Sequence, residues 1–274
     1  MMEVKLWTIC CLMLSGVPVS WTEEEMDLKK LASSQIANID MIDDVSVIIN
    51  YHQLREKRVY FTRDCDELYL LGHRKSGVYV IQPTGSPYLV VQCYMYDCGG
   101  WTVIQRNSFD TYISWHETWT AYEYGFGNIV LDHYLGNHYI KLLTAQKWYK
   151  VRFLLVDSEN RTRRADYDSF YLTNATDKYQ LKLGTYEGDA GDSLSSGNHK
   201  NLHDNMRFST YDDDNDRLHN VNCANKHGGG WWFDSCYDAH LNNKGLLHWK
   251  TLCDHNCRRS VILIKPVHMY CNRV

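Results

Sequence analysis

Apolar side chains in most of the chain are grouped in short runs that are typical of β-strands. From Tyr60 onward these runs are rich in Val, Ile, Tyr and Trp and are separated by Gly and polar turns. Strands are predicted at Tyr88 to Gln92, Trp101 to Gln105, Tyr149 to Val156 and Val261 to Ile264. Two shorter patches, His138 to Thr144 and Asp238 to Leu241, have the pattern of short connecting helices. The predicted fold class is therefore α+β, built on an antiparallel sheet.

Residues 21–58 have a different pattern. Between Trp21 and Lys57 there is no Gly, Pro or Cys, and the spacing of apolar residues is helical. The a and d positions of a heptad hold five apolar residues, Leu28, Leu31, Ile42, Val45 and Ile49. Polar Gln35 and Asn38 fill the slots between them, so the seam is polar in its middle. A short coiled coil that makes a homo-oligomer is one interpretation of 21–58; an amphipathic helix packed on its own domain and a frayed stalk are the alternatives.

The first residues, 1–20, are predicted to be a secretory signal peptide. Lys5 precedes a nine-residue apolar stretch, Leu6 to Leu14, and small residues follow up to Ser20. That stretch is too short to span a bilayer, and no later apolar run is long enough either. We therefore expect a secreted, extracellular protein. Two triplets, which begin at Asn160 and Asn174, are glycosylation sequons and agree with this expectation.

The cysteine count supports the same compartment. Cys10 and Cys11 leave with the signal peptide, so 10 − 2 = 8 of the ten cysteines remain. An even number in an oxidising compartment favours disulfides.

Charge and motifs exclude several function classes. The 29 basic and 33 acidic residues give a formal charge of −4, which is not the electrostatic signature of a nucleic-acid-binding protein. The sequence has no Gly-x-Ser-x-Gly elbow, and His116-Glu117 lacks the second His of a zinc-protease helix. We therefore predict that the protein is not an enzyme.

The acidic run at residues 212–216 is the densest candidate site. Its sequence is Asp-Asp-Asp-Asn-Asp, and side-chain oxygens at alternate positions of a tight loop can converge on calcium. The run is not an EF-hand, because Arg217 stands where that loop needs Gly and Cys223 where it needs Glu. A solvated acidic turn is the alternative, but five acceptor-rich residues in a row repel one another unless a cation neutralises them.

From Cys65 onward the chain contains a series of short motifs: Cys65-Asp66-Glu67-Leu68, Cys98-Gly99-Gly100-Trp101-Thr102, Tyr124-Gly125-Phe126-Gly127-Asn128, Tyr134-Leu135-Gly136-Asn137, Gly191-Asp192-Ser193-Leu194, Met206-Arg207-Phe208-Ser209-Thr210, Asn222-Cys223-Ala224 and Gly230-Trp231-Trp232. These motifs are similar to those of the fibrinogen-related family, which includes fibrinogen chains, ficolins, tenascins and angiopoietins. The similarity covers about residues 61–266, and with the helical segment before it the chain resembles the hepassocin-type members most.

The resemblance implies a fold and two disulfides. Residues 61–274 would form a fibrinogen C-terminal globular domain, with an N-terminal hairpin, a central antiparallel sheet and a loop-rich, calcium-binding C-terminal part. Cys65 would pair with Cys93 in the hairpin, and Cys223 with Cys236 beside the acidic run. The resemblance places calcium between the carboxylates of Asp214 and Asp216, with main-chain carbonyls at Leu218 and near Asn220. One residue more than the family pattern lies between Asp214 and Cys223.

The resemblance also places a ligand pocket beside the calcium loop. Its residues would be Ser235, Cys236, Tyr237 and His240, and the bond between Ser235 and Cys236 is often cis in the family. A stretch of about twenty residues that normally lines this pocket is missing after Asn243. We therefore expect a soluble ligand for a cell-surface protein receptor, and the alternative is an innate-immune lectin of ficolin type that binds acetylated glycans.

Four further cysteines lie outside the two family disulfides: Cys98, Cys253, Cys257 and Cys271. Four cysteines allow three pairings, and Cys98 with Cys271 is one candidate pair. Cys253-Asp254-His255-Asn256-Cys257 contains a Cys-x-His-x-Cys pattern that can hold zinc with Cys271. Disulfides are the favoured interpretation in a secreted chain, and an intermolecular bond is a third option.

Overall fold

The computed structural model describes residues 61–195 and 201–267. The predicted signal peptide (1–20), the predicted helical segment (21–58) and Cys271 lie outside these residues. Within them, the structure is mostly β-sheet with a few short helices, and the predicted α+β class is confirmed.

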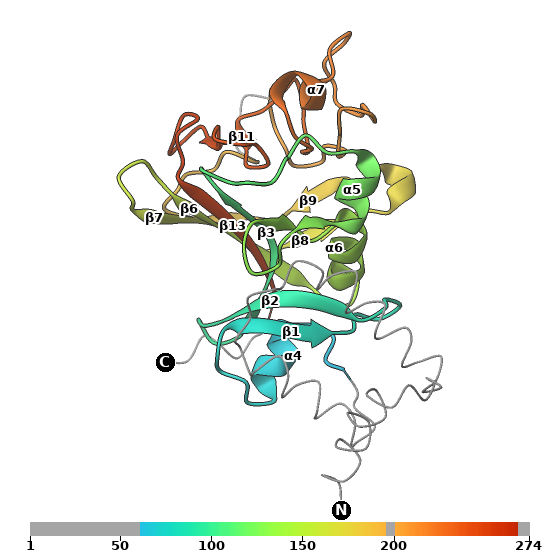
Figure 1. The fold of residues 1–274 in the computed structure, drawn as a ribbon, viewed down its shortest axis with the longest axis vertical. Coiled ribbons are helices and arrows are strands. Elements are labelled where there is room, and N and C mark those ends of the chain that lie inside the picture. The colour runs from blue at the N-terminus through green and yellow to red at the C-terminus, as the bar shows by residue number, and fades with distance from the viewer. Residues whose placement is uncertain (1–60, 196–200, 268–274) are drawn as a thin grey trace, which may run out of the picture. The chain divides into compact units, whose positions relative to one another are not determined.

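The helices and strands are labelled as in Figure 1. The larger strands are β1 (Gly77–Ile81), β2 (Leu89–Met95), β3 (Gly100–Ser108), β6 (Tyr149–Val156), β7 (Thr162–Tyr167) and β13 (Arg259–Pro266). The shorter strands are β4 (Phe126–Gly127), β5 (His133–Tyr134), β8 (Phe170–Leu172), β9 (Leu181–Leu183), β10 (Tyr186–Gly188), β11 (Ala239–His240) and β12 (His248–Trp249). The helices are α4 (Cys65–Leu70), α5 (Trp119–Tyr124), α6 (Asn137–Thr144), the 3₁₀ helix η1 (Ala175–Asp177) and α7 (Cys223–His227).

A nine-stranded sheet organises the described part of the chain. Its main path is β1-β2-β3-β13-β6-β7-β10, all neighbours pair antiparallel, and β4 and β5 attach beside β3. β13 lies between β3 and β6, so the strand latest in chain order is central in space. The four predicted strands are confirmed and correspond to β2, β3, β6 and β13.

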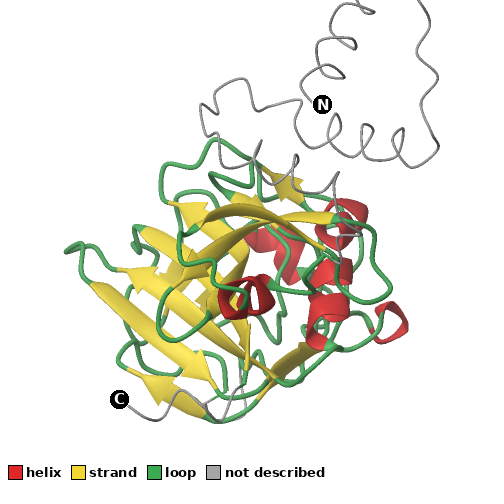
Figure 2. Ribbon diagram, turned by 90° about the horizontal axis from the view of Figure 1, so that it is seen from below, coloured by secondary structure: helices red, strands yellow, loops and turns green. Residues whose placement is uncertain are grey.

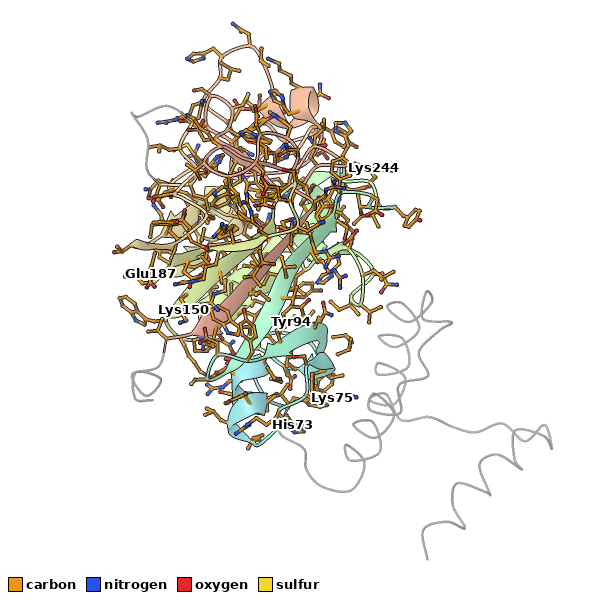
Figure 3. All side chains as sticks on the ribbon, turned by 90° about the vertical axis from the view of Figure 1, so that its left-hand side faces the viewer. His73, Lys75, Tyr94, Lys150, Glu187 and Lys244 are labelled. Carbon is orange, nitrogen blue, oxygen red and sulfur yellow. A yellow bond between two sulfur atoms is a disulfide. The ribbon has the colours of Figure 1, made fainter. Side chains whose placement is uncertain are left out.

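Alternation along β3 and β13 divides apolar residues between the two faces of the sheet. The main core contains Ile104, Phe153 and Ile262, while Trp101, Val103, Val261 and Leu263 form a separate cluster on the opposite face. Three cations surround the indole of Trp101 in that second cluster. The charged groups of Lys150, Arg152 and Lys265 lie 5.2, 4.6 and 4.8 Å from its ring centroids, within the range of cation–π attraction. Lys150 and Tyr94 mark this face in Figure 3.

The N-terminal hairpin, β1 and β2, is held to α4 by a disulfide. Asp64 caps α4 by accepting a hydrogen bond from the Glu67 amide at 2.8 Å. Cys65 in the first turn of the helix bonds to Cys93 on β2, and both cysteines are buried. The structure thus contains the first disulfide that the resemblance implies, and the bond joins the helix to the hairpin (Figure 1).

α5 and α6 pack side by side next to the sheet (Figure 1), and most of the helices lie to the right of the long strands in Figure 2. The predicted helix at His138 to Thr144 is confirmed as α6. The predicted helix at Asp238 to Leu241 is wrong, because Ala239 and His240 form β11, which pairs antiparallel with β12. Four residues are too few for a helical pattern to outweigh pairing with a strand that approaches from further along the chain.

Candidate functional site

The acidic run and the second disulfide meet in the loop-rich C-terminal part, which also carries α7 and β11 (Figure 1). Cys223 at the start of α7 bonds to Cys236, so the structure contains the second disulfide that the resemblance implies. Trp231 and Trp232 lie between the two cysteines in sequence and are buried. The indole of Trp232 donates to the carbonyl of Tyr179 at 2.8 Å, which anchors this loop to the rest of the domain.

Residues earlier in the chain bind the first two carboxylates of the acidic run. Asp212 accepts hydrogen bonds from the Trp119 amide at 2.9 Å and the Thr210 hydroxyl at 2.7 Å. Asp213 forms a 2.7 Å ion pair with Lys178. The carboxylates of Asp214 and Asp216 are the other two acidic groups of the run, and they are the pair that the resemblance assigns to calcium.

Asp216 is held by the backbone of its own loop. Its carboxylate accepts hydrogen bonds from the Leu218 amide at 2.8 Å and the Cys223 amide at 2.7 Å. Burial raises the pKa of Asp216 and the nearby Asp214 charge adds to this, against the two amide hydrogen bonds. A carboxylate whose ionisation a neighbouring carboxylate opposes fits a site for a hard divalent cation, which would relieve that repulsion.

The two carbonyl positions assigned to calcium lie in the turn after Asp216. Leu218 is half-buried, and its carbonyl accepts a long hydrogen bond of 3.5 Å from the Val221 amide. Asn220 has a φ of 65°, in the left-handed region that Asn tolerates. This conformation reverses the chain before α7, within the stretch that has one residue more than the family pattern.

Asp234 links the acidic loop to the candidate ligand pocket, and sequence reasoning missed it. Its buried carboxylate accepts a 2.7 Å hydrogen bond from the Arg217 guanidinium and a 3.1 Å bond from the Leu202 amide. Burial opposes its ionisation, but Arg217 outweighs burial and lowers the pKa of Asp234. Nothing in the sequence spacing distinguishes Asp234 from an ordinary surface acid.

His203 is a second residue that sequence reasoning missed. Its Nδ1 lies 2.8 Å from the Trp232 carbonyl, and its Nε2 accepts from the amides of Asp238 and Ala239 at 3.1 and 2.9 Å. These partners require the neutral imidazole with its proton on Nδ1. The imidazole thus forms hydrogen bonds to both ends of the segment 232–239. This segment contains the Ser235-Cys236 peptide bond, which is cis in the structure.

The predicted pocket residues lie together, but they are packed on other side chains. Ser235 is exposed, Cys236 and His240 are buried, and Tyr237 is half-buried. The Tyr237 ring contacts those of His227, His240 and His248, with centroid distances of 4.9, 5.2 and 5.5 Å. Burial, and next the positive charge that His227 can carry, hold the pKa of His240 well below its ordinary value. The residues that the resemblance gives to the pocket wall therefore pack on one another and on His227 and His248.

The segment after Asn243, where the resemblance predicts a missing stretch, packs against the end of β3. The Asn107 amide donates to the carbonyls of Leu241 and Asn243, both at 2.8 Å. This packing brings the Gly245 backbone next to the Phe109 carbonyl.

Exposed side chains surround that contact. Tyr112 is 97% exposed, Leu246 51% and Phe109 40%. Lys244 and Arg258 are exposed on the adjoining segments, and Figure 3 shows Lys244 at the end of the domain opposite His73. We call this set, Phe109, Tyr112, Lys244, Leu246 and Arg258, the 109/246 surface.

The remaining sequence predictions concern the other cysteines and the two glycosylation sequons. Cys253 bonds to Cys257, so neither sulfur is available to the zinc site that the sequence left open. Cys98 lies in the turn between β2 and β3. Asn160, in the β6–β7 turn, and Asn174, before η1, are both exposed, as sequon asparagines must be to accept a glycan.

Comparisons with known proteins agree with this architecture. The family described as fibrinogen beta and gamma chains, C-terminal globular domain, matches residues 61–258. Fibrinogen-like protein 1-like protein of Gallus gallus is 45% identical over 215 residues, which cover 77% of this chain and 75% of that protein. Human fibrinogen-like protein 1 is 38% identical over 230 residues, which cover 80% and 71% of the two chains.

Solved structures show the same fold. The fibrinogen-like globe domain of human ANGPTL6 superposes with a TM-score of 0.70 and 34% identity, over 76% of this chain and 96% of that one. In the described residues, no helix combines the length and the apolar character that crossing a membrane requires. With the family match, the two disulfides and this superposition in agreement, the chain belongs to the fibrinogen-related family.

Proposed function

We propose that this protein is a secreted, calcium-stabilised, non-enzymatic recognition protein that acts as a soluble ligand for a cell-surface protein receptor. The single observation that carries the proposal is the contrast between the packed pocket residues and the 109/246 surface. Tyr237 packs on its histidine neighbours where the resemblance expects a ligand pocket, whereas large side chains are exposed beside the segment that follows Asn243.

The composition of the 109/246 surface suits a protein partner. Aromatic and arginine side chains contribute most of the energy in many protein interfaces, and the ring of Tyr112 stands almost fully in solvent. Lys244 and Arg258 add two positive charges at the rim, so the partner surface we expect has an apolar centre with acidic residues around it.

The test is a cell-surface receptor display screen with calcium-loaded protein, followed by affinity measurements on variants. Tyr112→Ala with Leu246→Ser removes exposed side chains only, so the fold is retained. We expect this variant to bind the receptor at least tenfold more weakly. Trp148→Ala with Tyr171→Ala, which changes two exposed side chains elsewhere, is the matched control. Equal affinity of the wild type and the 112/246 variant would exclude this surface.

The second candidate is a lectin for acetylated glycans. Techylectin-5A of Tachypleus tridentatus is 43% identical over 185 residues, which cover 65% of this chain and 61% of that protein. A glycan array with and without a calcium chelator separates the two functions. Chelator-sensitive binding that free acetylated sugar competes would favour the lectin, and silence on glycans with one reproducible receptor would favour the protein ligand.

A further inference from the structure

Three potential metal ligands, none of them from the acidic run, lie close together in β12 and the loop that follows it. Asp254 Oδ1 lies 3.2 Å from His248 Nδ1 and 2.6 Å from His255 Nδ1. The ligand atoms of the three side chains all lie within 4.8 Å of one another, and the described ranges contain no other such group of three or more His, Cys, Asp or Glu residues. The two imidazoles face each other with ring centroids 4.3 Å apart.

The backbone positions this group before any ion binds. His248 is on β12, and Asp254 and His255 lie in the five-residue loop that the Cys253–Cys257 disulfide closes. Trp249 and Cys253 exchange two backbone hydrogen bonds, at 3.0 and 2.8 Å, which fold this loop back beside His248. A ligand set that the chain already holds together loses little conformational entropy when a metal binds.

His248 has an unused donor atom at the centre of the group. The side chain is nine-tenths buried, and among the described residues its Nδ1 makes no hydrogen bond of good geometry, although Asp254 Oδ1 lies 3.2 Å away. A buried polar atom without a well-aligned partner is costly and calls for an explanation.

His255 has the outer contact that metal-binding histidines usually make. Its Nε2 lies 3.1 Å from the hydroxyl oxygen of Tyr237. His255 Nδ1 also lies 2.6 Å from Asp254 Oδ1, a hydrogen bond that uses a proton on Nδ1. A metal ion that displaces this proton leaves Nε2–H to donate to the Tyr237 oxygen, and Nδ1 then faces the ion as a ligand. Such a contact fixes the tautomer and orientation of a ligating imidazole.

We propose that His248, Asp254 and His255 bind a zinc ion through two imidazole nitrogens and one carboxylate oxygen, with one position open to water or to a partner's side chain. Zinc at about 2.0–2.1 Å from each ligand of a tetrahedron separates ligand atoms by about 3.3 Å. The 3.2 Å between His248 and Asp254 already matches this spacing. The shorter contact of Asp254 to His255 opens by rotation of Asp254, whose side chain is 82% exposed. Calcium prefers oxygen ligands, so this site and the acidic loop select different metals.

The experiment titrates zinc chloride into the full secreted protein by calorimetry. The protein is first stripped with a chelator and then returned to buffer with excess calcium, so that the acidic loop does not bind the added zinc. We expect one strong zinc site per chain. Asp254→Asn with His255→Gln changes two side chains at the surface of a disulfide-closed loop and should weaken that site at least tenfold.

The matched control is His73→Gln with His138→Gln, which removes two half-buried histidines on other elements and should leave zinc affinity unchanged. Cobalt(II) gives a readout of geometry, because the wild type should show the intense visible absorption of a tetrahedral site and the 254/255 variant should not. Three results would each overturn the proposal. The first is equal zinc affinity of the wild type and the 254/255 variant, and the second is zinc binding that is only weak and spread over several sites. The third is cobalt that binds without the tetrahedral spectrum.

Discussion

At the scale of single residues, buried polar side chains define the C-terminal part of the domain. His203 joins residues 232 and 238–239, and Asp234 joins Arg217 to Leu202. Each makes several directed hydrogen bonds in a buried position, where an unsatisfied partner is expensive. These contacts, more than any regular strand, hold the loops that carry the candidate sites.

His203 makes folding stability sensitive to mild acid. Burial lowers its pKa to about 4, although the Trp232 carbonyl and nearby Asp238 and Asp234 favour the proton. In the unfolded chain this imidazole has the ordinary pKa of about 6.5. Between about pH 6.5 and pH 4 the unfolded state therefore binds a proton at His203 that the folded state does not bind, and folding stability falls as the pH falls. The free energy of unfolding should therefore fall by about 2 kcal/mol between pH 7 and pH 5 because of this group alone.

Urea unfolding of wild type and His203→Gln at both pH values measures this contribution. We expect the variant to be about 1–3 kcal/mol less stable at pH 7, because buried amides lose an acceptor. It should also lose less stability than the wild type on going to pH 5. His133, whose pKa burial also lowers to about 4, contributes equally to both proteins and cancels in the comparison. An identical pH dependence of the two proteins would refute the role of His203.

At the scale of elements, the sequence pattern predicted the sheet well and the loops poorly. The runs of β3, β6 and β13 are long and rich in β-branched and aromatic residues, so periodicity alone identifies them. Ala239 and His240 form a strand only because β12 pairs with them. The acidic run stands out by its dense spacing, and the resemblance selects Asp214 and Asp216 within it, whereas Asp234 and His203 act through partners distant in sequence.

Calcium binding to the acidic loop should be measurable as a rise in melting temperature. Asp214→Asn with Asp216→Asn removes both charges but keeps an oxygen to accept the amides of Leu218 and Cys223. We expect this variant to lose the rise in melting temperature with calcium, which for a site saturated at one hundred times its dissociation constant corresponds to about 2.7 kcal/mol. Differential scanning calorimetry with and without chelator measures it.

The control for the calcium variant removes the same charge elsewhere. Asp110→Asn with Asp177→Asn changes two exposed carboxylates on other loops and should retain the full calcium shift. A calcium shift that persists in the 214/216 variant would mean that the ion binds at other residues.

At the scale of the whole domain, the disulfides close loops of different lengths and should contribute different amounts of stability. Cys65 and Cys93 are 28 residues apart, whereas Cys253 and Cys257 are 4 apart. In the chain-entropy description, a disulfide stabilises by restricting the unfolded chain, and longer loops gain more. The bond between α4 and the hairpin should therefore matter more for global stability than the small loop beside β12.

Paired alanine variants test this difference. Cys65→Ala with Cys93→Ala should lower the free energy of unfolding by about 3–4 kcal/mol, and Cys253→Ala with Cys257→Ala by about 2 kcal/mol. All four sulfurs are buried, so both variants lose similar packing and the comparison isolates loop length. Guanidinium unfolding of the two variants provides the numbers, and the opposite order of stability would contradict the entropic account.

The central position of β13 has a consequence for biosynthesis. β3 and β6 become neighbours of a common strand only through residues 259–266, which follow every other strand of the sheet in the chain. A nascent chain thus carries two half-sheets with open edges until this segment leaves the ribosome, and open strand edges pair readily with other chains. A premature stop before Arg259 should therefore yield a product that chaperones retain and proteases degrade, even though most of its sequence is intact.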